Sequence, residues 1–285
     1  LPTERLTLQD CQQRFPQFAP CTYDLATYNA EAGILHASSC LQALKKLVLE
    51  LGGKIYEGKR VTHIINDSLS RPIRLITHTG NEISIDRLVL TTGPWVHKLL
   101  GELRLPVQLT RQYLLYFAGL SPSLFGIGAF PAFISNELYG FPLQRMSNGQ
   151  GQGSYWFKAA SHDFGTLVDP DEILPQEERV IARIAYKLRE LLPALQHAEL
   201  AHVDSCMYDV TPDEDFILDR MPHDPRVVFA TGLSGHGFKF GLLLGELLSS
   251  MICGMSPAVS LERFRLARFG TRQRQPLPAG ISSVA

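Results

Sequence analysis

Three stretches of the chain place apolar residues three or four positions apart, which is the spacing of one helix face. The pattern predicts helices over residues 38–52, over 176–192 and from about 238 to 253. In the third helix Gly241 and Gly245 lie four positions apart, and we expect them to let it approach a sheet closely. The first helix has a predicted core face made of Leu41, Leu44, Leu47, Val48 and Leu51.

Shorter stretches have the composition of strands. Strands are expected at residues 54–57, 61–65, 73–77 and 82–85, the last two joined as a hairpin by Thr79-Gly80-Asn81. Residues 88–90 are an uninterrupted apolar run that ends in Thr91-Thr92-Gly93, and residues 226–230 are another candidate for a buried strand, ending in Thr231-Gly232. That pattern is typical of strands buried on both faces in a parallel sheet.

The pattern of apolar and aromatic residues between these two predicted strands differs from that of the segments on either side. This difference determines the expected architecture. From about residue 107 the chain partly alternates and is rich in aromatic residues, which favours an antiparallel sheet, whereas the first 36 residues are expected to be irregular. The sequence therefore predicts a mixed α/β (α+β) fold with an inserted domain. The α/β layer would comprise residues 33–106 and 213–279, and the antiparallel β-rich domain residues 1–32 and 107–212.

Composition narrows the classes of function. The 285 residues are 45% hydrophobic and 19% charged, with a net charge of −1, so nothing points to nucleic acid or an anionic membrane as a partner. The longest uncharged stretch, residues 112–136, is broken by glycines and prolines and is not a membrane helix. Five cysteines without a C-x-x-C pair argue against a disulfide framework or a zinc site, so a cytoplasmic protein without a metal is expected.

The glycine-rich segment 232–239 is the most informative motif. A turn between a buried strand and a helix exposes backbone N–H groups at the helix start, where Lys239 would add a positive charge, so the segment suits an anion or oxyanion. The alternative is a tight turn whose glycines serve only backbone geometry. A second glycine run, Gly149-Gln150-Gly151-Gln152-Gly153, has no strand before it and no helix after it and is interpreted as a loop.

Several other residues have reactive or ionisable side chains, but none of them indicates a functional site when it is considered alone. Cys206 is a lone cysteine, a type that is more often buried filler than a nucleophile or an attachment point. Lys158, His162 and Tyr139 would by themselves be polar surface residues.

Two ordered blocks, taken together, resemble a known family. The blocks are Cys206-Met207-Tyr208 with Thr211-Pro212-Asp213-Glu214-Asp215-Phe216-Ile217-Leu218-Asp219, and then Thr231-Gly232-Leu233-Ser234-Gly235-His236-Gly237-Phe238-Lys239-Phe240. They resemble the monomeric sarcosine oxidase group, which includes N-methyltryptophan oxidase and pipecolate oxidase. These are FAD-dependent enzymes of the D-amino-acid-oxidase-like superfamily. The resemblance extends over nearly the whole chain, through Glu31-Ala32-Gly33-Ile34-Leu35-His36, Leu90-Thr91-Thr92-Gly93-Pro94-Trp95, Arg111-Gln112 and Tyr139-Gly140-Phe141-Pro142.

The resemblance implies roles for individual residues. Cys206 matches the cysteine that carries FAD through a thioether, and Lys158 matches the lysine that promotes reaction of the reduced flavin with O2. Lys239 matches a lysine beside the flavin that helps to hold the substrate carboxylate, and Tyr139, His162 and Tyr208 match residues of the substrate cavity. The remaining cofactor-binding positions are Val61, Thr92, Gly93, Trp95, Gly235, His236, Gly237 and Phe238.

The sequence departs from the family's pattern at its N-terminal end. Its members open with a strand, G-x-G-x-x-G and a helix, and no such unit precedes residue 36. A fragment of a longer chain is the favoured interpretation over a truncated relative, because the remaining strands would expose apolar edges.

The predicted activity is FAD-dependent oxidation of an N-methyl or cyclic secondary amino acid to an imine, with O2 reduced to H2O2. A dehydrogenase using another acceptor and a non-catalytic relative unable to hold FAD are the alternatives.

Overall fold

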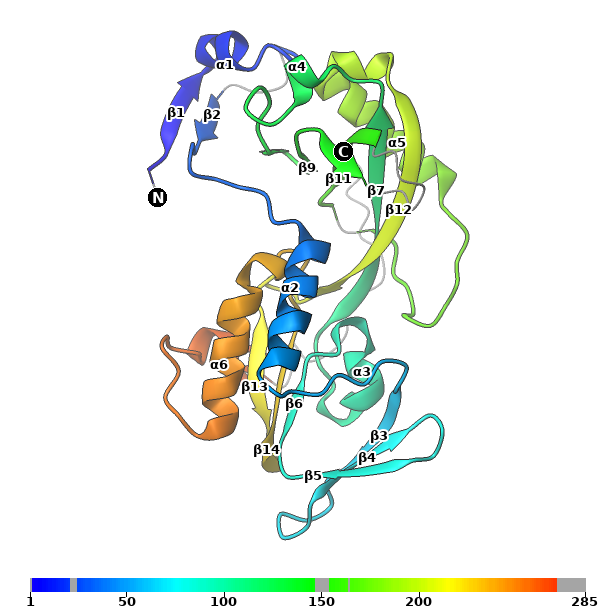
Figure 1. The fold of residues 1–285 in the computed structure, drawn as a ribbon, viewed down its shortest axis with the longest axis vertical. Helices are drawn as coiled ribbons and strands as arrows, with labels where there is room; N and C mark the ends of the chain where they lie inside the picture. Colours follow the sequence, from blue (N-terminus) through cyan, green and yellow to red (C-terminus); the bar gives the residue numbers. More distant parts are fainter. Residues whose placement is uncertain (1, 21–24, 147–153, 164, 271–285) are drawn as a thin grey trace. The chain divides into compact units, whose positions relative to one another are not determined.

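The computed structural model describes residues 2–20, 25–146, 154–163 and 165–270 (Figure 1). The glycine run 149–153 and the stretch 271–279 of the expected α/β layer lie outside the described residues. The chain divides into two compact units. Unit 1 consists of Leu1–Ile34, Arg111–Thr166 and Glu172–Cys206, and unit 2 of Leu35–Thr110, Leu167–Asp171 and Met207–Ala285.

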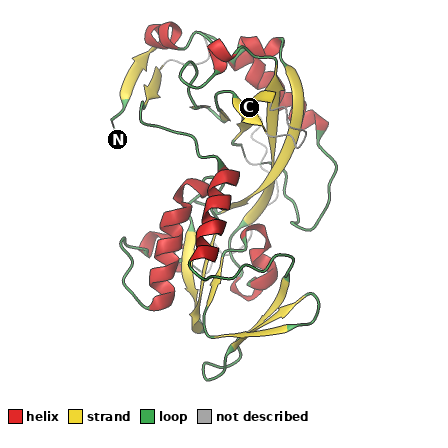
Figure 2. Cartoon of the chain, viewed as in Figure 1, coloured by secondary structure: helices red, strands yellow, loops and turns green. Residues whose placement is uncertain are grey.

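Unit 1 is built on a six-stranded sheet with strand order β12-β7-β11-β9-β8 and β10 paired to β11. Its elements are β7 (Gln108–Ala118), α4 (Pro122–Phe125), β8 (Phe133–Ser135), β9 (Leu138–Gly140), β10 (Gln144–Met146), β11 (Ser154–Ser161), α5 (Glu178–Leu191) and β12 (Glu199–Val210). The part of β7 before Arg111 and the part of β12 after Cys206 belong to unit 2. The pairs of β11 with β7, β9 and β10 are antiparallel, as expected for this part of the sequence. Figure 2 shows the strands of this sheet with helix α5 beside them.

One face of this sheet packs on α5. Leu115 and Phe117 of β7, Phe157 of β11 and Leu188 of α5 are fully buried in one cluster. The predicted helix over 176–192 is therefore confirmed, since its apolar stripe faces the core.

The N-terminal segment is more regular than the sequence analysis expected. It contains β1 (Glu4–Thr7), α1 (Leu8–Arg14) and β2 (Leu25–Tyr28), with β1 and β2 antiparallel. Helix α1 begins with a capping box: the Thr7 hydroxyl accepts from the Asp10 amide at 3.2 Å, and the Thr7 amide donates to the Asp10 carboxylate at 2.9 Å. The expectation of an irregular segment is wrong because this local signal, Thr-x-x-Asp, was overlooked.

Unit 2 contains two three-stranded sheets. The first has the order β13-β14-β6, and the second has the order β3-β4-β5. Their strands are β3 (Val61–Ile65), β4 (Ile73–Thr77), β5 (Glu82–Ile85), β6 (Leu88–Leu90), β13 (Ile217–Met221) and β14 (Asp224–Thr231). The helices and short 3-10 turns are α2 (Ala37–Glu50), η1 (Gly93–Trp95), α3 (Val96–Leu99), η2 (Gly101–Leu103), η4 (Phe238–Phe240), α6 (Gly241–Cys253), η5 (Glu262–Phe264) and η6 (Leu266–Phe269).

The two apolar runs do lie side by side. β6 pairs with β14 in parallel, with Val89 opposite Val228, so the prediction of one shared sheet is confirmed. β14 is buried on both faces, but β6 is an edge strand among the described residues and Val89 is 41% exposed. The expected hairpin of β4 and β5 is also present, whereas residues 54–57 form no strand.

The two long helices of unit 2 depart from their expected packing. Helix α2 buries none of its residues, and the leucines predicted to face a core are exposed. Helix α6 packs through Leu244, Leu247 and Leu248 against Val228 and its neighbours in the sheet. Gly241 and Gly245 have open space where a Cβ would lie, so the predicted close approach through these glycines is wrong.

Hydrogen bonds and ion pairs connect residues 167–171 to the rest of unit 2. The Asp171 carboxylate accepts hydrogen bonds from Trp95 Nε1 at 2.8 Å, Lys98 Nζ at 2.6 Å and Arg60 at 2.9 Å. Lys98 also binds Asp169 at 2.9 Å. The Lys98 ammonium, followed by the Trp95 indole, lowers the pKa of Asp171 to about 2.

The packing difference between the two 14-residue helices predicts unequal costs for the same substitution. Leu188→Ala on α5 opens a cavity in the core of unit 1 and should lower the free energy of unfolding by about 2–5 kcal/mol. Leu47→Ala on α2 removes an exposed side chain of the 285-residue chain and should cost less than about 0.5 kcal/mol. Urea unfolding followed by circular dichroism measures both, and equal losses would contradict the described packing.

The Asp171 cluster predicts a defined pH dependence. Because the pKa of Asp171 is lowered in the folded chain from about 3.8 to about 2, its ion pairs stabilise the fold above pH 4 and are lost as the pH falls toward 2. Asp171→Asn should therefore lower thermal stability at pH 5, and the difference from wild type should shrink between pH 4 and pH 2. Asp67→Asn is the control, since its carboxylate makes one 3.9 Å contact with Arg74. A difference that stays constant from pH 5 to pH 2 would refute the assignment.

Candidate functional site

The sheet face opposite to α5 in unit 1 carries a lysine among aromatic rings. Phe157 and Ala159 of β11 point into the core, so Lys158 between them points to the other face. Lys158 is paired with Tyr116 of β7, and its backbone carbonyl accepts from the Phe141 amide at 3.0 Å. The Lys158 ammonium lies 5.9 Å from the centre of the Tyr116 ring and 6.0 Å from that of Phe141, a distance at which aromatic rings attract a cation.

The thiol of Cys206 lies within electrostatic range of this lysine. Burial raises the pKa of Cys206. The positive charge of Lys158 acts in the opposite direction, and the negative charge of Asp204 adds to the effect of burial. Burial also raises the pKa of Tyr116, with smaller contributions from Asp204 and Cys206. The structure thus gathers a thiol, an ammonium group and a phenol in one part of unit 1, and it brings together Lys158 and Cys206, which the sequence analysis had selected separately.

Aromatic residues extend this face in two directions. Tyr139 of β9 lies opposite Ala160, and its ring centre is 5.9 Å from Phe141 and 6.2 Å from His162. On the other side His202 of β12 stacks on Trp156 at 5.9 Å and lies 5.5 Å from Tyr116. Tyr116, Trp156 and His202 were not selected from the sequence, because only strand register shows which aromatic residues share a face with Lys158. We call the set Tyr116, Tyr139, Phe141, Trp156 and His202 the aromatic face.

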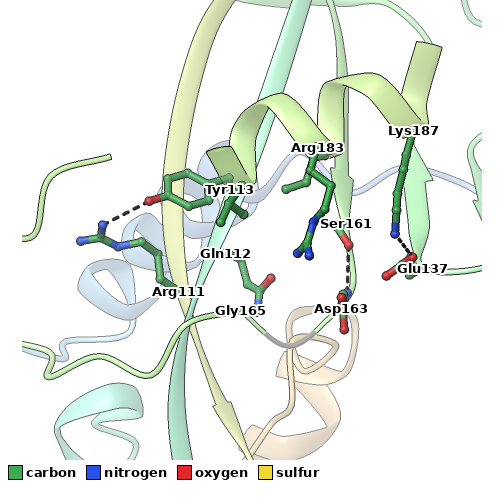
Figure 3. Close-up of a pocket in the computed structure, with 11 residues that line it drawn as sticks. Arg111, Gln112, Tyr113, Glu137, Ser161, Asp163, Gly165, Arg183 and Lys187 are labelled. Atoms are coloured by element: carbon green, nitrogen blue, oxygen red, sulfur yellow. Dashed lines mark hydrogen bonds and ion pairs between the residues drawn. The ribbon is translucent and has the colours of Figure 1, made fainter. Parts of the chain in front are cut away.

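Unit 1 also contains a small pocket beside α5 that is open to solvent (Figure 3). Arg183 and Lys187 of α5 line it together with Gln112 of β7 and Ser161 of β11. Two of its cations have partners: Lys187 is paired with Glu137, which also lines the pocket, and lowers the pKa of that carboxyl, and Arg111 donates to the carbonyls of Leu174 and Pro175. Neither Lys158 nor Cys206 lines this pocket, so it is separate from the aromatic face.

In unit 2 the glycine-rich turn follows β14 and needs its glycines. Gly232 and Gly235 have φ angles of +66° and +78°, which favour residues without a Cβ. A Cβ on Gly235 would lie 2.3 Å from the ring of Tyr208, and a Cβ on Gly237 would lie 2.6 Å from Leu233. Ser234 also has a left-handed φ of +48° and is buried. The backbone of this turn is therefore fixed by close packing.

The same turn leaves donors available for a ligand. The amide of His236 donates to Leu233, but the amides of Gly235, Gly237 and Phe238 donate to no other residue of the described chain. They are followed by η4 and α6, and the exposed Lys239 side chain lies 5.5 Å from the ring of Phe240. Unpaired amides at a helix start suit a carbonyl or an anion. The contacts of Gly235 and Gly237 with Tyr208 and Leu233 fit the interpretation as a tightly packed turn, and ligand binding at the amides stays a prediction.

A buried aspartate supports this turn from β12. Asp209 accepts from the Gly232 amide at 2.7 Å, from the Leu233 amide at 3.1 Å and from the Thr231 hydroxyl at 3.2 Å. Burial raises the pKa of Asp209, although these donors act to lower it. The sequence analysis missed Asp209 because its partners lie more than 20 residues away.

The other predicted cofactor and substrate positions are spread over unit 2. Val61 begins β3 opposite Thr77, and Thr92 precedes the 3-10 turn η1, in which Gly93 has φ +50°. Trp95 is held by Asp171. Tyr208, assigned to the substrate cavity together with Tyr139 and His162, belongs to unit 2 and packs under Gly235, whereas the other two residues belong to unit 1.

Three of the four acidic residues of the block 211–219 have structural partners. Asp213 binds Arg268 at 2.8 Å, Asp215 binds Arg263 at 2.6 Å and Asp219 binds Arg265 at 2.7 Å. The Arg268 guanidinium also lowers the pKa of Asp213. These carboxylates are acceptors for the turns η5 and η6 and are not candidates for proton transfer.

The described residues also bear on metal binding and on membrane spanning. No group of three or more His, Cys, Asp or Glu side chains there is placed to hold a metal ion. None of the helices in that part of the chain has both the length and the apolar composition needed to cross a bilayer.

Comparison with known proteins gives consistent results. The chain is 31% identical to the peroxisomal sarcosine oxidase of Homo sapiens over 276 residues, which covers 93% of this chain and 67% of the human protein. It is 29% identical to the N-methyl-L-tryptophan oxidase of Salmonella typhimurium over 279 residues, covering 94% of this chain and 70% of that protein.

Solved structures share the fold. Glycine oxidase from Geobacillus kaustophilus superposes with a TM-score of 0.76 at 20% identity, covering 94% of this chain and 67% of that one. L-proline dehydrogenase from P. horikoshii gives 0.77 at 19% identity, covering 94% and 69%. The model of the DAO family of FAD dependent oxidoreductases matches residues 1–251. The chain therefore belongs to the DAO family of FAD dependent oxidoreductases.

Proposed function

We propose that this chain forms part of an oxidase of secondary amino acids, either N-methylated or cyclic. The substrate's C–N bond loses two electrons and two protons and becomes an imine, and O2 gains them and becomes H2O2. The observation that carries the proposal is the placement of Lys158 and Cys206 together beside Tyr116 of the aromatic face. Similarity to sarcosine oxidase and N-methyl-L-tryptophan oxidase supports the class of substrate.

FAD supplies the two-electron acceptor for this reaction, and the residues that the resemblance names would hold it. Cys206 would attach FAD through a thioether. The amides of Gly235, Gly237 and Phe238, with Lys239 and His236, would receive the polar edge of the flavin ring. Val61, Thr92, Gly93 and Trp95 would bind the remainder of the cofactor. The expected FAD-binding domain is thus 33–106 with 213–279, and the expected substrate domain is 1–32 with 107–212.

Lys158 would favour the reaction with O2. Its ammonium group, set among rings rather than beside a carboxylate in the described chain, would stabilise the negative charge that develops on oxygen. The aromatic face would exclude water from the amine, and Tyr139 with His162 would line the space that the amino acid occupies. Oxidation of a free cytoplasmic amino acid needs no nucleic acid or membrane partner.

Oxygen consumption tests the proposed reaction directly. With sarcosine or L-pipecolate as substrate under air, the full-length protein should produce one H2O2 for each amine oxidised, because O2 is the final acceptor. Turnover only with an artificial acceptor would indicate a dehydrogenase instead. Absence of turnover with secondary amino acids under both conditions would indicate a non-catalytic relative.

The attachment of FAD predicts a specific effect of one cysteine. Acid-precipitated wild-type protein should keep flavin fluorescence, and Cys206→Ser protein should lose it, because only a covalent bond survives denaturation. Cys253→Ser is the matched control, since Cys253 is exposed at the end of α6. Fluorescence retained in Cys206→Ser protein would refute attachment at this residue.

The role of Lys158 predicts unequal changes in the two half-reactions. Lys158→Met should slow reoxidation of the reduced flavin by O2 by ~100-fold or more, the usual cost of removing one preorganised electrostatic group, and should change reduction by substrate far less. Stopped-flow absorbance measures each step. Lys46→Met, which removes an exposed charge from α2, is the control. Equal slowing of both half-reactions would assign Lys158 a structural role.

A further inference from the structure

The end of β12 holds the glycine-rich turn through four consecutive residues. The Asp209 carboxylate accepts from the Thr231 hydroxyl and from the Gly232 and Leu233 amides, and the Asp209 carbonyl accepts from the Ser234 amide at 2.9 Å. One residue of β12 therefore engages every residue from 231 to 234. The next amides along the chain, of Gly235, Gly237 and Phe238, are the ones left unpaired in the described chain.

The hydrogen bonds to Asp209 divide the amides of the turn into two groups, those that Asp209 binds and those that follow Ser234. The amides of Gly232 and Leu233 are consumed by Asp209 and cannot serve a ligand, whereas those after Ser234 project from a backbone whose start is fixed. Asp209 is 8% exposed, so water does not compete for these hydrogen bonds. A carboxylate also accepts more strongly than an amide or a hydroxyl, which makes it suited to holding several donors at once.

Residues close to Asp209 in the sequence also contact the glycine-rich turn. The Tyr208 ring packs directly under Gly235, and the Thr211 amide donates to the Ser234 hydroxyl at 3.4 Å. Cys206 lies three positions before Asp209 on the same strand. The strand that carries the proposed attachment point therefore also shapes the turn proposed to receive the polar edge of the ring.

We propose that Asp209 is a positioning residue that holds the turn 231–234 so that the amides of Gly235, Gly237 and Phe238 are preorganised for the flavin. The inference rests on the proposed function for the identity of the ligand. It does not need the cofactor to be present for its first test, because the hydrogen bonds exist in the chain alone.

Hydrogen–deuterium exchange gives that first test without FAD. Asp209→Asn replaces an acceptor oxygen with an NH2 group that faces amide donors, so exchange of segment 231–238 should accelerate by about tenfold or more. Exchange of β13 and of residues 226–230 should stay unchanged, which reports that the variant is folded. Asp204→Asn is the matched control, because Asp204 lies exposed on the same strand and, among the described residues, its side chain accepts only from the Ser205 amide.

A gentler variant keeps the test valid if Asp209→Asn fails to fold. Thr231→Val has nearly the same shape and removes one of the donors to Asp209 while leaving the carboxylate in place. It should accelerate exchange in the same segment to a smaller extent. Unchanged exchange of 231–238 in both variants would overturn the inference.

The second test measures FAD affinity in a Cys206→Ser background, where binding is reversible. Asp209→Asn should raise the dissociation constant for FAD about tenfold over the Cys206→Ser parent, as measured by flavin fluorescence. Faster exchange with an unchanged dissociation constant would reduce Asp209 to a structural residue and overturn the inference. A Cys206→Ser parent that binds no FAD at all would instead overturn the proposed function, while the exchange result would still decide whether Asp209 holds the turn.

Discussion

The candidate site depends on a buried carboxylate whose partners come from a distant turn. Removing Asp209 from water raises its pKa, and three donors from residues 231–233 offset that cost. A buried charge tolerates few geometries, so the end of β12 and the turn after β14 are fixed together. The same constraint positions the amides of Gly235, Gly237 and Phe238, which are unpaired in the described chain, and Tyr208 packs under Gly235.

Elements whose signal is local could be predicted from the sequence. The parallel pairing of β6 with β14, the hairpin of β4 and β5 and the apolar stripe of α5 all agree with their periodicity. Predictions failed where burial of an element depends on what the rest of the fold packs against it. Helix α2 has a regular apolar stripe, yet nothing in the described chain covers it, and a stripe alone does not say what it packs against.

The candidate site was predicted only in part for the same reason. Resemblance selected Cys206 and Lys158, and the fold places them in one unit within electrostatic range. Tyr116 and His202 were missed because register, and not residue type, sets them beside Lys158. The Tyr208 ring packs under Gly235, a contact that residue type does not reveal, and its assignment to a substrate cavity stays a prediction.

Peptide mapping of the flavin tests the central claim, that β12 joins the attachment point to the turn that receives the ring. Cleavage after Arg189 and Arg220 yields a peptide in which Cys206 is the only cysteine. The account predicts that acid-denatured full-length protein, digested with trypsin, carries the mass of FAD on this peptide at Cys206. The mass of FAD on a peptide containing Cys11, Cys40 or Cys253, or on no peptide, would contradict it.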